Sequence, residues 1–115
     1  MMWMLETVYT TKAMRYDKAY IRKALAQGRE TDGAVIIALD TDGDHPVEIV
    51  VADELLKDFY PERDLLVLGI AESVYKAQQL LVTMTDDVVA ATGKADLASY
   101  YRELWENGST VKITC

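Results

Sequence analysis

Ala34-Val35-Ile36-Ile37-Ala38-Leu39 is the stretch that decides the fold, because every one of its positions is apolar. A strand with one wet face alternates apolar and polar residues, whereas a strand covered on both faces is apolar throughout. A second run of this kind occupies residues 65–71. Two central strands are therefore predicted. Four side chains are expected to be almost fully buried: Val35, Ile37, Leu66 and Leu68.

The segment after the first central strand predicts a hairpin. Asp40-Thr41-Asp42-Gly43-Asp44-His45 separates that strand from the strand-like run at 46–51. An Asp-Gly pair between two such runs is a strong hairpin signal, because glycine and aspartate tolerate the positive φ angles of a tight turn. We therefore place Asp42 and Gly43 in the turn.

Two helical segments precede the second central strand. The first covers residues 10–27 and ends at Gly28, and it could begin at Thr10, at Thr11 or only after Asp17 acting as N-cap. The later start is favoured, because Asp17 would otherwise fall within the apolar face. A short helix over residues 54–59 follows, with Asp53 as its cap and Pro61 beyond its end.

Two further helices follow the second central strand. The longest is expected over residues 74–92, between an N-cap at Ser73 and Gly93. Its apolar residues recur every three or four positions, which predicts one buried stripe. The stripe consists of Val74, Ala77, Leu81, Met84, Val88 and Ala91. A last helix is expected over residues 96–106.

A first strand at 3–9 and a weak edge strand at 110–114 complete the order β-α-β-β-(short α)-β-α-α(-β). This order predicts an α/β fold of the α+β type. It would be a two-layer or three-layer sandwich on a mixed, largely antiparallel sheet of four or five strands. The 115 residues suit one globular domain over 1–115.

Charge is unevenly distributed along the chain. The formal net charge is −7, which argues against the whole surface docking on nucleic acid or on an anionic membrane. Residues 10–29 nevertheless hold six basic residues against the single acidic Asp17. On a helix, Arg15, Lys18 and Arg22 share one side. These three residues are a candidate interaction surface.

The leading functional hypothesis is a non-enzymatic interaction or regulatory protein that self-associates as a homodimer or binds another protein. The basic side of the first helix would meet an acidic surface. Tyr100, Tyr101 and Trp105 on the last helix would add apolar contact, since these residues suit interfaces. Binding of nucleic acid through the basic helix ranks third, because the net charge opposes it.

The second hypothesis is a small-molecule or anion-binding domain, a role that would also suit a small enzyme. Its site would lie where the strand at 65–71 meets the helix at 74–92, around Glu72 and Ser73. Backbone N–H groups at such a junction can hold a ligand. Asp42 and Asp44 of the acidic turn at 40–45 are weaker candidates for the same role.

Catalytic, cofactor and metal sites are not predicted. His45 and Cys115 are the only histidine and cysteine, so a Cys–His pair is not expected and an internal disulfide is excluded. The acidic turn lacks the ligand spacing of a calcium loop. Without a signal peptide or a membrane span, and with one cysteine, the chain is expected to be cytoplasmic.

Overall fold

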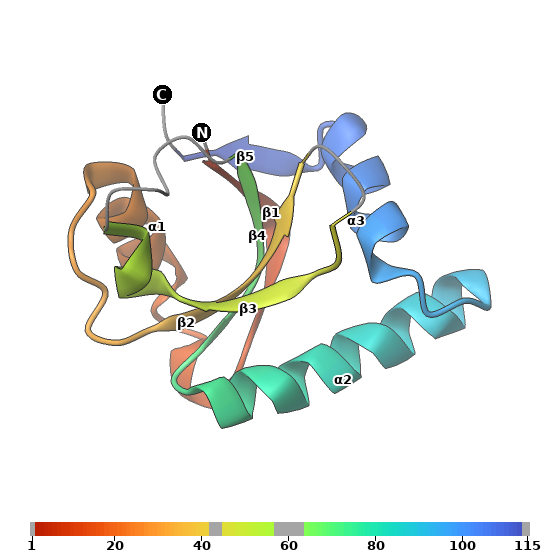
Figure 1. Cartoon of the computed structure of the whole chain (residues 1–115), viewed down its shortest axis with the longest axis horizontal. Helices are drawn as coiled ribbons and strands as arrows, with labels where there is room; N and C mark the ends of the chain where they lie inside the picture. The colour runs from red at the N-terminus through yellow and green to blue at the C-terminus, as the bar shows by residue number, and fades with distance from the viewer. Residues whose placement is uncertain (1, 42–44, 57–63, 114–115) are drawn as a thin grey trace.

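Five strands form one mixed sheet (Figure 1). The computed structural model describes residues 2–41, 45–56 and 64–113. The strands are β1 (Met2–Thr10), β2 (Val35–Asp40), β3 (Glu48–Val51), β4 (Leu65–Ala71) and β5 (Thr110–Lys112). Their order across the sheet is β3-β2-β4-β1-β5. Only β1 and β4 pair in parallel, and the other neighbours are antiparallel, as the predicted α+β class requires.

The two apolar runs form adjacent strands in the interior of the sheet, as predicted. β2 and β4 pair along their whole lengths, from Val35 opposite Ala71 to Asp40 opposite Leu65. The four side chains predicted to be buried are all at most 3% exposed. Apolar side chains on both faces of these strands therefore make up the centre of the core.

Helices cover both faces of the sheet, so the sandwich has three layers. The helices are α1 (Lys18–Gln27), α2 (Val74–Thr92) and α3 (Leu97–Glu106), with short 3₁₀ helices η1 (Lys12–Met14) and η2 (Ala52–Leu56). On β1, Trp3 and Tyr9 contact residues of α3 and α2. Met4 and Val8 instead line a cleft with α1. α1 therefore lies on one face, and α2 and α3 lie on the other (Figure 1).

The predicted helix boundaries are largely confirmed. α1 begins after Asp17 and ends at Gly28, whose φ of 64° is left-handed. Asp17 makes no side-chain hydrogen bond that caps α1. The start of α1 after Asp17 is therefore explained by the exclusion of this residue from the apolar face of the helix. Ser73 caps α2 by accepting a hydrogen bond from the N–H of Lys76, and Gly93 ends the helix.

The prediction for the short helix is wrong in its position and cap. η2 covers residues 52–56, with Asp53 inside it and the Asp53 carboxylate bonded to residues 31–33. Residues 57–59 and the Asp42–Gly43 turn lie outside the described residues. β3 begins at Glu48 instead of at Pro46, since pairing with β2 starts at Ala38 opposite Glu48.

The predicted stripe on α2 is buried only in its middle. Ala77, Met84 and Val88 are buried, whereas Val74 at the first turn and Ala91 near the end are exposed. The C-terminal end of α2 extends past the sheet, which leaves Ala91 without a surface to cover (Figure 1). Among the described helices, none has the length and apolarity needed to cross a membrane.

Candidate functional site

The one parallel strand pair creates a natural place for a ligand. β1 and β4 end at the same edge of the sheet, where the Thr11 N–H donates to the Ile70 carbonyl. From there β1 leads to α1 on one face, whereas β4 leads to α2 on the other (Figure 1). In open α/β sheets, a crevice forms at the carboxyl ends of strands whose connections diverge in this way.

A pocket of about 220 Å³ opens at this edge. It lies between the segment after β1, the start of α1, the loop before β2 and the residue after β4. Its lining residues are Met14, Asp17, Tyr20, Ile21, Thr31, Asp32, Gly33, Ala34 and Glu72. Glu72 is a residue that the sequence placed at the strand–helix junction, so that junction does open into a pocket.

Asp53 fixes the loop that forms one wall of the pocket. Its carboxylate accepts hydrogen bonds from the Thr31 N–H and the Thr31 hydroxyl, both at 2.7 Å, and from the Gly33 N–H at 3.2 Å. The two bonds from Thr31 lower the pKa of Asp53, because they favour the charged carboxylate. Asp32, between these anchored residues, holds the left-handed φ of 58°.

Tyr20 forms the opposite wall, from the first turns of α1. Its hydroxyl donates to Asp32 Oδ2 at 3.2 Å. That hydrogen bond raises the pKa of Tyr20 above its usual value, although the nearby Arg29 works in the other direction. Tyr20 stays neutral, and its bond to Asp32 holds one pocket carboxylate toward the aromatic ring.

Three residues with carboxylate side chains line this small volume: Asp17, Asp32 and Glu72. Among the described residues that line the pocket, none is lysine or arginine. The described chain contains no group of three or more histidine, cysteine, aspartate or glutamate residues placed to hold a metal ion. The three carboxylate residues therefore line the pocket without converging on one point as metal ligands do.

Comparisons with protein-family models, curated proteins and solved structures give no match. The function of this chain therefore has to follow from its own side chains.

Ser73, the other described residue predicted for a ligand site, is not among the residues that line the pocket. The Ser73 hydroxyl accepts the hydrogen bond of a helix cap from Lys76 at 3.1 Å. Asp42 and Asp44 lie outside the described residues. Asp17, Tyr20 and Asp32 were missed, although the sequence offered one signal: Asp17 breaks the apolar face of a helix that begins directly after it.

The predicted basic surface is exposed to solvent, but its three residues do not share one helix, because α1 begins at Lys18 and Arg15 lies before it. Arg15, Lys18 and Arg22 are all exposed, and the Arg15 guanidinium lies 4.7 Å from the centre of the Tyr16 ring. Lys18 and Arg22 line a cleft against β1, beside Glu6. A surface with these contacts can bind a partner, and an ordinary solvated helix face has the same contacts.

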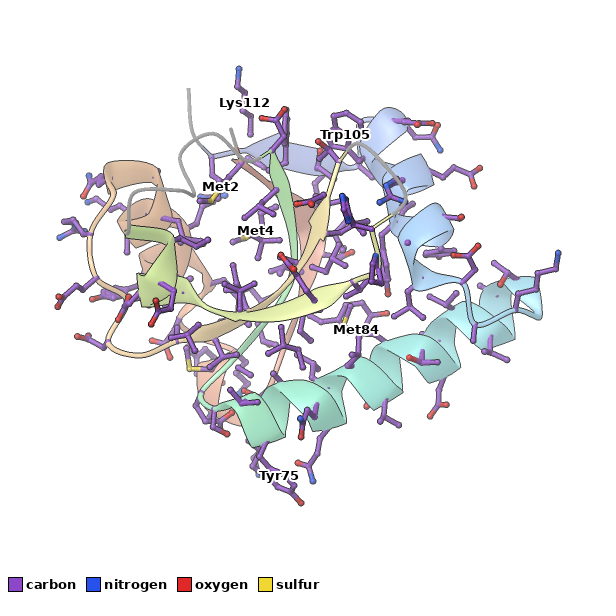
Figure 2. The ribbon with its side chains drawn as sticks, in the orientation of Figure 1. Met2, Met4, Tyr75, Met84, Trp105 and Lys112 are labelled. Carbon is purple, nitrogen blue, oxygen red and sulfur yellow. The ribbon has the colours of Figure 1, made fainter. Side chains whose placement is uncertain are left out.

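The predicted aromatic surface is mostly internal packing. Tyr101 is 2% exposed, and its ring packs edge-on against Tyr100, with 5.1 Å between ring centres. Trp105 is half-buried and packs against Trp3 of β1 at 5.3 Å (Figure 2). Tyr101 is therefore unavailable to a partner, because these residues hold α3 against the sheet.

A hydrogen bond joins β1 to α2, in which the Tyr9 hydroxyl donates to Asp87 Oδ2 at 2.7 Å. Burial and this hydrogen bond together raise the pKa of Tyr9 far above its usual value. The Tyr101 hydroxyl lies nearby and is buried, yet it makes no hydrogen bond of good geometry with the described residues. This cluster was not predicted from the sequence.

The Tyr9→Phe variant is expected to lose about 1 kcal/mol of stability at pH 7, because a hydrogen bond to a carboxylate is removed. The loss should fade at alkaline pH. The unfolded chain releases the tyrosine proton near pH 10, whereas folded Tyr9 keeps it, so the stabilisation by Tyr9 falls as pH rises above about 10. Urea unfolding at pH 8 and pH 11 measures both effects.

Tyr101→Phe is the matched control for that experiment, because it removes a buried hydroxyl without a well-formed hydrogen bond. It should leave stability unchanged or raise it slightly. Equal losses in the two variants would contradict the assignment of the interaction to Tyr9 and Asp87.

Proposed function

We propose that this chain is a non-enzymatic binding domain whose pocket takes a small organic cation carrying a primary amine or a guanidinium group. The observation that carries the proposal is the lining of the pocket: Asp17, Asp32 and Glu72 surround one space together with the ring of Tyr20. The anion considered from the sequence alone is disfavoured, since three carboxylates would repel it.

The chemistry of the lining matches such a cation. Carboxylates accept charge-assisted hydrogen bonds from ammonium and guanidinium groups, and separated carboxylates can be bridged by a group with several N–H donors. The partly exposed face of Tyr20 can add a cation–π contact. Met14 and Ile21 offer apolar surface for a short alkyl chain.

Size and rigidity also support binding of a small ligand. The pocket volume of about 220 Å³ is below that of sites for drug-sized molecules, which occupy roughly 300–1,000 Å³. The hydrogen bonds that Asp53 accepts from Thr31 and Gly33 hold the Thr31–Gly33 wall before any ligand arrives. A preformed site reduces the entropy lost on binding.

Binding is favoured over catalysis because of what the lining can do. Among the described lining residues, the only hydroxyl besides Tyr20 belongs to Thr31, and it already donates to Asp53. A hydroxyl that acts as a nucleophile must reach the substrate, whereas Thr31 is only 3% exposed and its hydroxyl is held by Asp53. The pocket carboxylates are suited to recognition of charge.

Titration with agmatine and putrescine, followed by ¹H–¹⁵N NMR, tests the proposal. We expect saturable shifts of the Gly33 and Ala34 amides, and no such shifts with phosphate or citrate. Asp32→Asn and Glu72→Gln should each weaken binding by about tenfold, in keeping with the loss of one charge-assisted contact.

Glu30→Gln is the matched control for those variants, since Glu30 is an exposed carboxylate just before the loop and outside the pocket lining. It should bind both amines as the unmodified protein does. Absence of shifts at Gly33 and Ala34, or equal weakening by Glu30→Gln, would contradict the proposed site.

A further inference from the structure

The outer face of α2 carries apolar side chains that the fold does not use. Met84 points from this helix toward the sheet, whereas Tyr75 points away from it (Figure 2). On the outer side, Tyr75 is 64% exposed, Val82 63% and Val89 41%. The Tyr75 hydroxyl accepts a hydrogen bond from Gln79 on the same helix, but none of the three side chains packs against the core, although a helix with one buried face normally carries polar residues on its other face.

The three residues form one line along the helix. They are spaced by seven residues, which is nearly two full helical turns, so each lies only about 20° around the axis from the previous one. The line runs for about 20 Å at 1.5 Å per residue. Two paired helices contact each other along residues that recur every 3.5 positions on average, so this stripe supplies every second position of such a seam, with Gln78 and Thr85 at the positions between.

From this stripe we infer that α2 is the surface through which two copies of the chain associate, with the helices antiparallel and a twofold axis passing beside Val82. The stripe is symmetric about that residue, since Tyr75 and Val89 each lie seven positions away. An antiparallel second copy therefore places Val82 against Val82 and Tyr75 against Val89. Such self-complementarity is what a twofold interface requires.

Charges flanking the stripe favour the same orientation. Lys76 and Asp86 lie on the same flank of the stripe. When two helices pair antiparallel, this flank of one copy lies beside the same flank of the other copy. Lys76 of one copy then approaches Asp86 of the other, twice over. Parallel pairing brings opposite flanks together, so it does not place Lys76 against Asp86 of the other copy. Exposed pairs of this kind choose the orientation more than they add affinity.

The size of the stripe sets the expected strength of the dimer. One pair of helices in contact over about 20 Å buries less than the roughly 1,200 Å² of a standard stable interface. We therefore expect a dimer with a dissociation constant in the micromolar range. The basic surface of α1 is not part of this interface.

Cysteine crosslinking tests the arrangement directly, in a Cys115→Ser background that removes the native thiol. Under mild oxidation, Val82→Cys alone should form a disulfide-linked dimer, because this position meets itself at the axis. Tyr75→Cys and Val89→Cys should not crosslink alone, yet a mixture of the two should. Efficient crosslinking of all three single variants would overturn the antiparallel arrangement.

Sedimentation between about 1 and 500 µM tests association itself, since a micromolar dimer must dissociate over this range. Val82→Glu should weaken the dimer by at least about tenfold, because a charge is buried at the centre of the seam. Val74→Glu is the matched control: Val74 is 45% exposed at the first residue of the same helix and outside the stripe. It should leave the dimer intact.

Two results would overturn the inference. One is a monomer at every concentration. The other is a dimer that persists in Val82→Glu but dissociates at high salt and when Arg15, Lys18 and Arg22 are changed to glutamate. That result would assign association to the basic surface. Val82 does not line the pocket, so either result leaves the cation-binding proposal to its own test.

Discussion

Asp53→Ala is expected to lower the free energy of unfolding by about 2–3 kcal/mol and to weaken cation binding in the pocket. The variant removes the acceptor of three hydrogen bonds and leaves the donors of the buried Thr31 unpaired. Without this anchor, Asp32 no longer has support for its left-handed backbone. Urea unfolding measures the first effect, and the agmatine titration measures the second.

The effect of Asp53→Ala should depend on pH in a defined direction. Hydrogen bonds from Thr31 lower the pKa of Asp53 in the folded state. This carboxylate therefore stabilises the protein above its unfolded pKa of about 3.9, and the contribution is lost as pH falls below that value. The difference between protein and variant should shrink at acid pH. Glu30→Ala is the control, and an equal loss there would refute the anchoring role.

Ile36→Ala is expected to cost about 3–4 kcal/mol, the largest single effect among these predictions. Ile36 lies on β2, is fully buried, and sits between Val50 of β3 and Ile70 of β4. Its truncation leaves a cavity that a sheet paired on both sides cannot collapse around. Against a typical domain stability of about 5–15 kcal/mol, such a loss should produce a large shift in the urea midpoint.

Ile49→Ala offers the comparison for that core variant. Ile49 carries the same side chain on the edge strand β3 and is only half-buried. It should cost less than about 2 kcal/mol, because solvent replaces part of the lost contact. Similar costs at the two positions would mean that β2 is not the centre of the core.

The elements predicted best from the sequence are those decided by local chemistry. Two-sided apolarity identified β2 and β4, and the caps at Ser73 and Gly93 identified the ends of α2. Asp53 shows where this approach fails. An aspartate carboxylate can accept hydrogen bonds either as the cap at the start of a helix or as the anchor of a distant loop. Only the tertiary structure brings Thr31 within hydrogen-bonding distance of Asp53.

The pocket could be predicted only in part, for the same reason. Glu72 follows an apolar strand and marks the site by its position in the sequence. Asp32 joins it only because β2 runs antiparallel to β4 and returns the loop before β2 to the same edge, and Tyr20 joins it because β1 ends at that edge and leads into α1. The aromatic residues of α3 were predicted to meet a partner, whereas they pack mostly inside the fold. The sequence of an amphipathic helix does not show whether its apolar face packs on the sheet or on a partner.

The pairing of β1 has a kinetic consequence for the folding chain. β1 is synthesised before the other strands of this sheet, yet its neighbours are β4, where Met2 pairs with Leu65, and β5, where Trp3 pairs with Lys112. Both partners lie more than about 60 residues away, so loop closure must precede any pairing of β1. Until β4 emerges from the ribosome, β1 is an apolar segment with two open edges, and it is then most exposed to aggregation and to chaperones.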